Sequence, residues 1–223
     1  MVPDPSPPPP PEPAIEAVVF DFDGTLVDSR FVDEAAVGEL IALDPSATAG
    51  AGIFWSHDGE PLLTRIETAW PGRSAEVLPL FERPTAPRLF PGITSLLDAM
   101  QGAGLAMAVV SSRRLAALRQ GLEATGLLHH FPVVVGLEDV AQPKPSPEGL
   151  LLALRWLGVE PPRTVFVGDN ELDIEAGHRA GVTVWRAVWG LPSLHTVPDS
   201  PNGIVLLHRP EEVGERLGRL SRR

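Results

Sequence analysis

The sequence predicts an α/β fold: a doubly wound parallel sheet with a small α-helical cap inserted into it. From residue 88 onward, short apolar runs of β-forming residues alternate with segments whose apolar residues recur at helical spacing. An earlier apolar run, Ala17 to Phe20, is followed over residues 30–87 by helical patterns without strand alternation. Alternating strands and helices are typical of a parallel sheet that helices cover on both faces.

Proline dominates residues 1–13, which can form neither a helix nor an interior strand, and we expect a disordered tail there. A ligand for a proline-binding domain is the less favoured interpretation, since the core of the tail has no flanking basic residues. Residues 14–29 and 88–223 are assigned to the sheet-containing core, and residues 30–87 to the cap.

Helices in the cap are expected over residues 31–41, 61–70 and 74–81, separated by turns that contain glycine and proline. Asp33 and Glu34 lie early in the first of these helices, where the helix dipole favours acids. In the core, the expected strands are 105–110, 133–135, 164–167, 182–187 and 203–207. The expected core helices are 92–102, 113–125, 147–157, 171–180 and 211–220.

The composition of the chain indicates which binding partners and which cellular compartment to expect. A formal charge of −11 disfavours nonspecific binding of nucleic acid. No apolar run reaches the roughly 18 residues of a membrane span, so we expect no membrane association. The chain has no cysteine, which excludes disulfides, thiolate zinc sites and cysteine nucleophiles. Because the N-terminus lacks a signal-peptide pattern, we expect a cytoplasmic protein, either a monomer or a weak homodimer.

The first strand ends in two carboxylates, Asp21 and Asp23, followed by Gly24, Thr25 and a Leu-Val-Asp-Ser sequence. Ligands bind at the carboxyl ends of strands in open α/β sheets, and Gly24 permits the turn that would bring both acids into such a crevice. Two carboxylates brought together repel each other, so the pair indicates a bound divalent cation.

Two further loops follow in the core. Ser111 and Ser112 end a buried strand; Ser112 could cap the next helix, and a serine here could equally donate to a phosphate oxygen. Lys144 lies in a loop of alternating prolines and is the single lysine beside 17 arginines. A compact ammonium fits between a carboxylate and a phosphate where a planar guanidinium does not, although a chance surface lysine is the alternative.

The fourth loop places Gly168, Asp169 and Asp173 after another buried strand. Four-residue spacing at a helix start puts Asp169 and Asp173 on one side of the helix. Acids also cap helix N-termini, and Asp169 alone would be interpreted in that way. Together with the two acids of the first loop, they favour an oxygen-rich Mg²⁺ site.

In this order, the four loops resemble the four motifs of the haloacid dehalogenase superfamily, over roughly residues 15–30 and 88–190. Residues 90–92, 173–181 and 189–190 are similar to the corresponding stretches of its phosphoglycolate phosphatase-like and β-phosphoglucomutase-like branch. The sequence departs from that pattern at Ser111 and Ser112, where many relatives have Thr-Asn, and in the cap, which matches no relative in detail. The resemblance implies a Rossmann-like core and an enzyme of this superfamily.

The resemblance also implies the chemistry: a Mg²⁺-dependent phosphatase that acts on a small phosphorylated metabolite through an aspartyl-phosphate. Asp21 would be the nucleophile and Asp23 the general acid and base. Asp21, the backbone carbonyl of Asp23 and Asp169 would hold Mg²⁺. The remaining roles would be phosphate binding by Ser111, Ser112 and Lys144, and orientation of Lys144 or a metal-bound water by Asp173.

Single residues distinguish the phosphatase from other activities of the same superfamily. Asp23 disfavours a dehalogenase, and the absence of a lysine between residues 30 and 87 disfavours a phosphonate-cleaving enzyme. A phosphomutase and, with less support, a noncatalytic binding module on the same fold stay open. Substrate choice should come from the cap, where the candidate contacts are Trp55, His57, Asp58 and Arg65. His129 and His130 adjoin a helix end, where cations are favoured, and are not expected to be ligands.

Overall fold

The computed structural model describes residues 14–57, 59–82, 88–191 and 204–220. The expected proline-rich tail, residues 1–13, and the specificity candidate Asp58 lie outside the described residues. Within the described ranges, every helix is too short or too polar to cross a lipid bilayer.

A six-stranded sheet forms the centre of the core and confirms the predicted α/β fold. Its strands run parallel in the order β5-β4-β1-β6-β7-β8. Their bounds are β1 (Ala17–Phe20), β4 (Ala106–Val110), β5 (Val133–Val135), β6 (Thr164–Gly168), β7 (Thr183–Ala187) and β8 (Val205–Leu207). All four residues of β1 are fully buried, which explains why this strand has no polar face.

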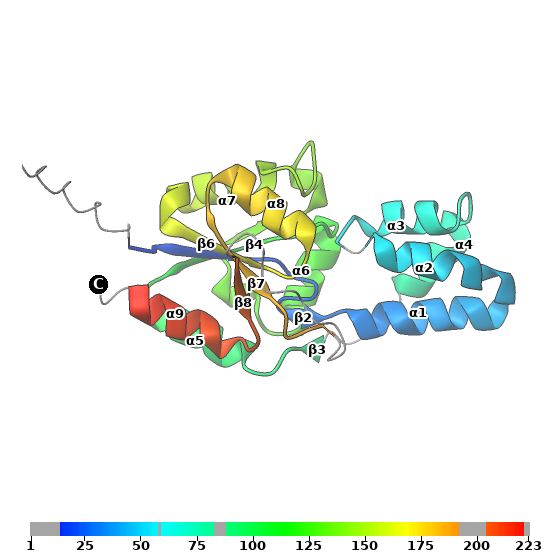
Figure 1. The fold of residues 1–223 in the computed structure, drawn as a ribbon, viewed down its shortest axis with the longest axis horizontal. Coiled ribbons are helices and arrows are strands. Elements are labelled where there is room, and N and C mark those ends of the chain that lie inside the picture. Colours follow the sequence, from blue (N-terminus) through cyan, green and yellow to red (C-terminus); the bar gives the residue numbers. More distant parts are fainter. Residues whose placement is uncertain (1–13, 58, 83–87, 192–203, 221–223) are drawn as a thin grey trace, which may run out of the picture.

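Helices cover both faces of the sheet (Figure 1). One face packs against α5 (Ile93–Gly102), α6 (Leu115–Ala124) and α9 (Glu211–Leu220), through a hydrophobic cluster that includes Phe20, Leu97 and Leu122. The other packs against α7 (Glu148–Leu157) and α8 (Glu171–Ala180), through a cluster that includes Val19 and Phe166. Because residues alternate between faces along β1, Val19 and Phe20 belong to different clusters.

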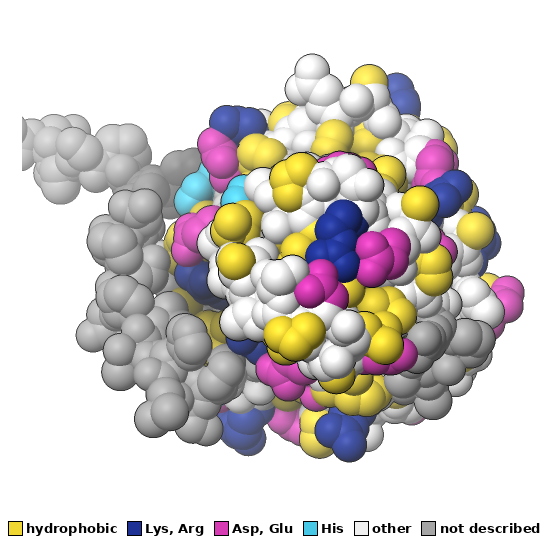
Figure 2. Space-filling view, turned by 90° about the vertical axis from the view of Figure 1, so that its right-hand side faces the viewer, with side chains coloured by type: hydrophobic (Ala, Val, Ile, Leu, Met, Phe, Trp, Pro, Cys, Tyr) yellow, Lys and Arg dark blue, Asp and Glu magenta, His cyan; other side chains and the backbone are white. Residues whose placement is uncertain are grey.

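The insert after β1 forms a separate lobe at one end of the molecule (Figure 1). It consists of α1 (Arg30–Leu43), α2 (Thr48–Ser56), α3 (Leu62–Ala69) and α4 (Ser74–Phe81), packed around a hydrophobic cluster of their own. A short antiparallel pair, β2 (Val27–Asp28) and β3 (Arg88–Leu89), lies where the chain leaves and re-enters the core. Figure 2 faces the cap and shows acidic and basic side chains interspersed there, with no patch of one sign.

Helix α2 was not expected from the sequence, because its glycines disfavour a helix. Packing within the cap compensates: Phe54 on α2 is fully buried. At Gly50, a side chain is excluded, because an added Cβ would lie 2.4 Å from both the backbone oxygen of Ala69 and the indole nitrogen of Trp70. The glycine that weakens α2 as an isolated helix therefore lets it approach α3 closely.

Candidate active site

Three neighbouring strands bring the predicted loops to one edge of the sheet. Phe20, the last residue of β1, lies opposite Val109 of β4 and Val167 of β6. Because the strands are parallel and in register, the residues that follow them meet at the carboxyl edge. Asp21 therefore lies between the loops that carry Ser111 and Asp169.

Lys144, from the third loop, contacts an aspartate of the first loop and an aspartate of the fourth loop. Its Nζ lies 2.6 Å from Asp21 Oδ1 and 2.6 Å from Asp173 Oδ1. The lysine is only 8% exposed, which excludes a chance surface position. Burial acts to lower the pKa of Lys144, but the charges and hydrogen bonds of Asp173 and Asp21 outweigh it and raise the pKa. The ammonium is therefore a fixed positive charge beside Asp21.

Three carboxylates cluster around this ammonium. One oxygen from each of Asp21, Asp169 and Asp173 can be chosen so that all three lie within 4.8 Å of one another. Burial and, to a smaller extent, the nearby carboxylates raise the pKa of Asp21 to about 8, although Lys144 acts to lower it. One ammonium does not balance three carboxylates. The residues present thus fit a divalent cation with oxygen ligands, which would supply the missing positive charge.

The local structure of the fourth loop separates the roles of its acids. Asn170 is the N-cap of α8: its Oδ1 accepts from the backbone nitrogens of Leu172 at 2.9 Å and Asp173 at 3.2 Å. Asp169 is therefore not the capping residue. Its Oδ1 accepts from Asn170 Nδ2 at 3.1 Å, while Asp173 Oδ2 accepts from the backbone nitrogen of Asp169 at 3.1 Å. Each carboxylate is held in place by this loop.

Gly24 allows the first and fourth loops to approach each other. Its φ is +76°, a left-handed conformation that favours glycine, and an added Cβ would lie 2.1 Å from Asp169 Oδ2. The turn that follows Asp23 therefore needs glycine for both its backbone conformation and its contact with Asp169.

The second loop offers two hydroxyls. Ser111 is buried, and its Oγ accepts from the backbone nitrogen of Arg113 at 3.1 Å, which leaves its hydroxyl proton able to donate. Ser112 Oγ is buried without a hydrogen-bond partner among the described residues. Helix α6 begins only at Leu115, whose backbone nitrogen donates to Glu138 Oε2 at 2.7 Å, so Ser112 does not cap it. Ser111 thus has a hydroxyl proton to offer a ligand, and Ser112 Oγ has no hydrogen-bond partner among the described residues that would compete with one.

Arg113 is a site residue that the sequence interpretation missed. Its Nε and a terminal nitrogen donate to the two carboxylate oxygens of Asp23, at 2.6 Å and 2.8 Å. Burial acts to raise the pKa of Asp23, but the charge and hydrogen bonds of Arg113 outweigh it and hold the pKa below its usual value. The available signal was a cation directly after the two serines, in the loop that follows β4, the strand adjacent to β1.

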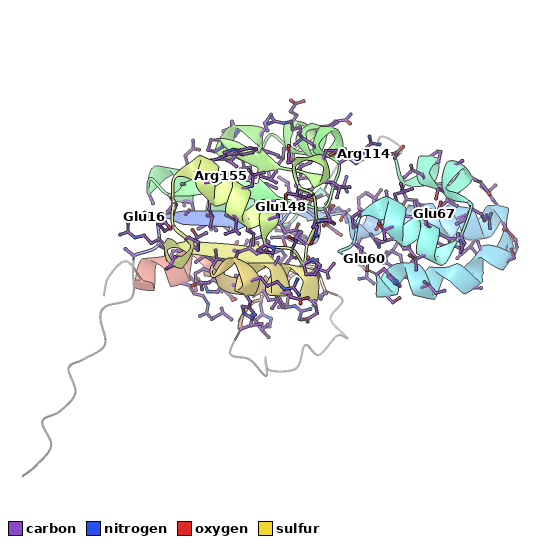
Figure 3. All side chains as sticks on the ribbon, turned by 90° about the horizontal axis from the view of Figure 1, so that it is seen from above. Glu16, Glu60, Glu67, Arg114, Glu148 and Arg155 are labelled. Carbon is purple, nitrogen blue, oxygen red and sulfur yellow. The ribbon has the colours of Figure 1, made fainter. Side chains whose placement is uncertain are left out.

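A cavity of about 320 Å³ is lined by residues of both the cap and the fourth loop. Its lining includes His57 and Glu60 from the cap and Asp169 and Arg186 from the core. Figure 3 shows Glu60 on the cap side of this junction. Gly59, in the same cap segment, has a φ of +88°, and an added Cβ would lie 2.7 Å from Asn170 Nδ2. The segment that carries His57 therefore touches the fourth loop.

The other described specificity candidates, Trp55 and Arg65, pack within the cap. Arg65 is 7% exposed, its terminal nitrogen donates to Asp33 Oδ2 at 3.0 Å, and its guanidinium lies 3.9 Å from the ring centre of Phe54. Trp55 is half-buried and meets Phe54 edge-on at 5.1 Å between ring centres. Burial raises the pKa of Asp33 to about 6, although Arg65 lowers it.

Comparison with known proteins identifies the family. A sequence model described as haloacid dehalogenase-like hydrolase matches residues 81–187. The chain is 30% identical to phosphoglycolate phosphatase of Aquifex aeolicus over 213 residues, which cover 89% of this chain and 95% of that protein. It is 29% identical to N-acetylmuramic acid 6-phosphate phosphatase of Pseudomonas aeruginosa over 222 residues, covering 92% and 96%.

A solved structure supports the same fold. The crystal structure of a HAD family hydrolase from Deinococcus radiodurans superposes with a TM-score of 0.69 at 22% identity, covering 93% of this chain and 96% of that one. The chain belongs to the haloacid dehalogenase-like hydrolases. Within that family it is a phosphatase, that is, a phosphoric monoester hydrolase.

Proposed function

We propose that this phosphatase hydrolyses a small-molecule phosphate monoester, with Mg²⁺ bound, through an aspartyl-phosphate on Asp21. The observation that carries the proposal is the buried cluster in which Lys144 binds Asp21 and Asp173 while Asp169 lies alongside. Lys144, together with a cation held by the carboxylates, would supply the positive charge needed where a dianionic phosphate meets an anionic nucleophile.

Each residue of the cluster has a distinct part in the proposal. Asp21 attacks phosphorus with the carboxylate oxygen that Lys144 does not bind, and the alcohol oxygen leaves. Lys144 and the hydroxyls of Ser111 and Ser112 hold the phosphoryl oxygens, and Asp173 orients Lys144. The carboxylates of Asp21 and Asp169 and the backbone carbonyl of Asp23 would hold Mg²⁺. When bound, this ion neutralises phosphate charge and so lowers the barrier to nucleophilic attack.

Asp23 supplies the proton transfers. In the first step it donates a proton to the leaving oxygen, and in the second it removes a proton from the water that attacks the aspartyl-phosphate. Arg113 favours the ionised carboxylate, which is the form required in the second step. The first step requires protonated Asp23, so at least one of its two hydrogen bonds to Arg113 must be released before the proton is delivered.

Substrate choice is assigned to the cavity between cap and core. At about 320 Å³ it lies at the small end of the range of ligand pockets, which suits a small phosphorylated metabolite. His57 and Glu60 provide polar contacts from the cap, and Arg186 lies across from them on the core. The cap does not identify the metabolite, and two relatives act on unlike esters, phosphoglycolate and N-acetylmuramic acid 6-phosphate.

The proposal is tested by measuring phosphate release from a panel of small phosphate esters, with Mg²⁺ and with EDTA. We expect release that needs Mg²⁺ and is lost in Asp21→Asn while the far-ultraviolet circular dichroism spectrum is unchanged. Full activity of Asp21→Asn with Mg²⁺ would refute the assignment of the nucleophile. Isomerised sugar phosphate without net phosphate release would support a phosphomutase instead.

A further inference from the structure

A second cluster of metal-ligating side chains lies far from the proposed catalytic loops. His129 and His130 end the short helix η2 (Leu128–His130), and Asp98 lies on α5. One ligand atom from each can be chosen so that all three lie within 4.8 Å of one another. Helix η2 precedes β5 and α5 precedes β4, so this cluster is near the amino ends of the strands, at the edge opposite Asp21.

The buried imidazole of His130 has one nitrogen without a suitable partner. His130 is 2% exposed, and its Nδ1 lies 2.9 Å from the amide oxygen of Gln101. With the amide oxygen of Gln101 as the acceptor, Nδ1 carries the proton and the lone pair of a neutral ring is on Nε2. Nε2 is buried, makes no hydrogen bond within the described residues, and faces Asp98 Oδ1 at 3.6 Å.

The buried Nε2 of His130 and the carboxylate oxygen of Asp98 thus lie 3.6 Å apart without a hydrogen bond between them. A cation bound between these two atoms would be attracted to both, and His129 could supply a further ligand atom to it.

We propose that His129, His130 and Asp98 form a binding site for a divalent cation of the Zn²⁺ class. Two imidazoles and one carboxylate suit a borderline-soft ion such as Zn²⁺ better than Mg²⁺, which prefers oxygen ligands alone. Three protein ligands leave a fourth tetrahedral position for water. Gln101 acts as the outer partner that fixes the ring of His130, a role that metal-bound histidines commonly require.

The geometry allows the site to close around an ion. Zn²⁺ lies roughly 2.0–2.1 Å from its ligands, so tetrahedral ligand atoms are roughly 3.3 Å apart. Only His130 is buried; His129 is exposed and the side chain of Asp98 is 64% exposed. These two can therefore rotate onto the ion by about 1 Å without disturbing the core.

Binding would link α5 to η2 and so stabilise the core without taking part in catalysis. Phe131, which follows His130, packs edge-on against Phe20 of β1 at 6.2 Å between ring centres. A ligand that binds only the folded chain raises its stability. We therefore expect Zn²⁺ to raise the midpoint of thermal unfolding, an effect that is independent of turnover.

The test is isothermal titration calorimetry, in which Zn²⁺ alone is added to the tag-free protein. EDTA treatment followed by dialysis first removes bound metal and the chelator. The background variant Asp169→Asn weakens the catalytic carboxylate cluster, so that binding to the second site is measured separately. In that background, Asp98→Asn and His129→Ala, both exposed positions, should each weaken Zn²⁺ binding by more than the roughly 10- to 100-fold loss typical of an outer-partner change. His178→Ala, an exposed histidine on α8, is the matched control and should leave binding unchanged.

Nitrogen-15 resonances of the histidine rings provide an independent readout. Zn²⁺ should shift His130 Nε2 and leave Nδ1 protonated, and the shift should vanish in Asp98→Asn. Equal Zn²⁺ affinity with and without the two substitutions would overturn the proposal, as would a His130 Nε2 that carries a proton and does not respond to Zn²⁺. Asp98→Asn should retain wild-type phosphatase activity, so this result stands apart from the catalytic proposal.

Discussion

Replacing Lys144 by methionine removes the one ammonium from the carboxylate cluster while keeping the length of the side chain. Nζ contacts Asp21 and Asp173 at 2.6 Å each, and both carboxylates are buried. Without the ammonium, the cluster relieves the repulsion by binding an additional proton. The cost of that proton sets the expected loss of stability in the absence of metal.

The magnitude follows from the ordinary pKa of aspartate, about 3.9 in the unfolded chain. Protonating one carboxylate costs about 4 kcal/mol at pH 7 and about 1.5 kcal/mol at pH 5, at 1.36 kcal/mol per pH unit. Loss of one partner of a buried ion pair typically costs a similar 3–5 kcal/mol. In the folded variant, the pKa of the carboxylate that takes up this proton lies above its value in the unfolded chain. The loss of stability relative to the wild type is therefore small at low pH and grows as pH rises.

The assay is urea unfolding followed by tryptophan fluorescence, at pH 5 and pH 7, with EDTA present. Lys144→Met should lose about 3–4 kcal/mol at pH 7 and no more than about 1.5 kcal/mol at pH 5. Arg155→Met, an exposed cation on α7 at the end of the core away from the cap, should change stability by less than about 0.5 kcal/mol (Figure 3). An equal loss at both pH values, or less than about 1 kcal/mol at pH 7, would refute the reasoning.

Three pairs of substitutions test the geometry of the site and of the cap. Gly24→Ala should lower kcat/KM by about 10² by displacing Asp169, whereas Gly72→Ala, with a φ of +74° and no atom near the added Cβ, should cost about 1–2 kcal/mol of stability without loss of activity. Equal activities of the two would contradict this. Arg113→Met should lower kcat by about 10² by releasing Asp23, and Arg114→Met, whose partner Glu138 is exposed, should not; steady-state kinetics decides. Arg65→Ala should lose about 3 kcal/mol in urea unfolding because Asp33 stays buried without its cation, whereas His57→Ala should raise KM with little change in stability. A KM unaffected by His57→Ala would remove that residue from the substrate site.

The core and its four loops could be predicted because each depends on local sequence. Buried strands of a parallel sheet are apolar throughout, and a polar residue directly after such a strand lies at the carboxyl edge whatever the rest of the chain does. Asp21, Ser111 and Asp169 were predicted at this edge in this way. A role for Lys144 was predicted because it is the single lysine of the chain.

Features that depend on contacts between distant segments could not be predicted. Arg113 became a site residue only when its guanidinium was seen to bind Asp23, ninety positions away in the chain. Helix α2 is stabilised by packing that its own sequence does not reveal. His130 was interpreted as a residue at a helix end where cations are favoured, but it is buried, and its Nε2 faces Asp98 on a helix some thirty residues earlier.

The most direct test of the central claim is to detect the phosphoryl group on Asp21. Wild-type protein is mixed with its best substrate and Mg²⁺, quenched in acid within the first turnover, and its peptides are analysed by mass spectrometry. The account predicts one phosphoryl group on the peptide that contains Asp21 in the wild type, and none in Asp21→Asn. Turnover at the wild-type rate with no phosphoryl group on that peptide, or with the group on another residue, would contradict it.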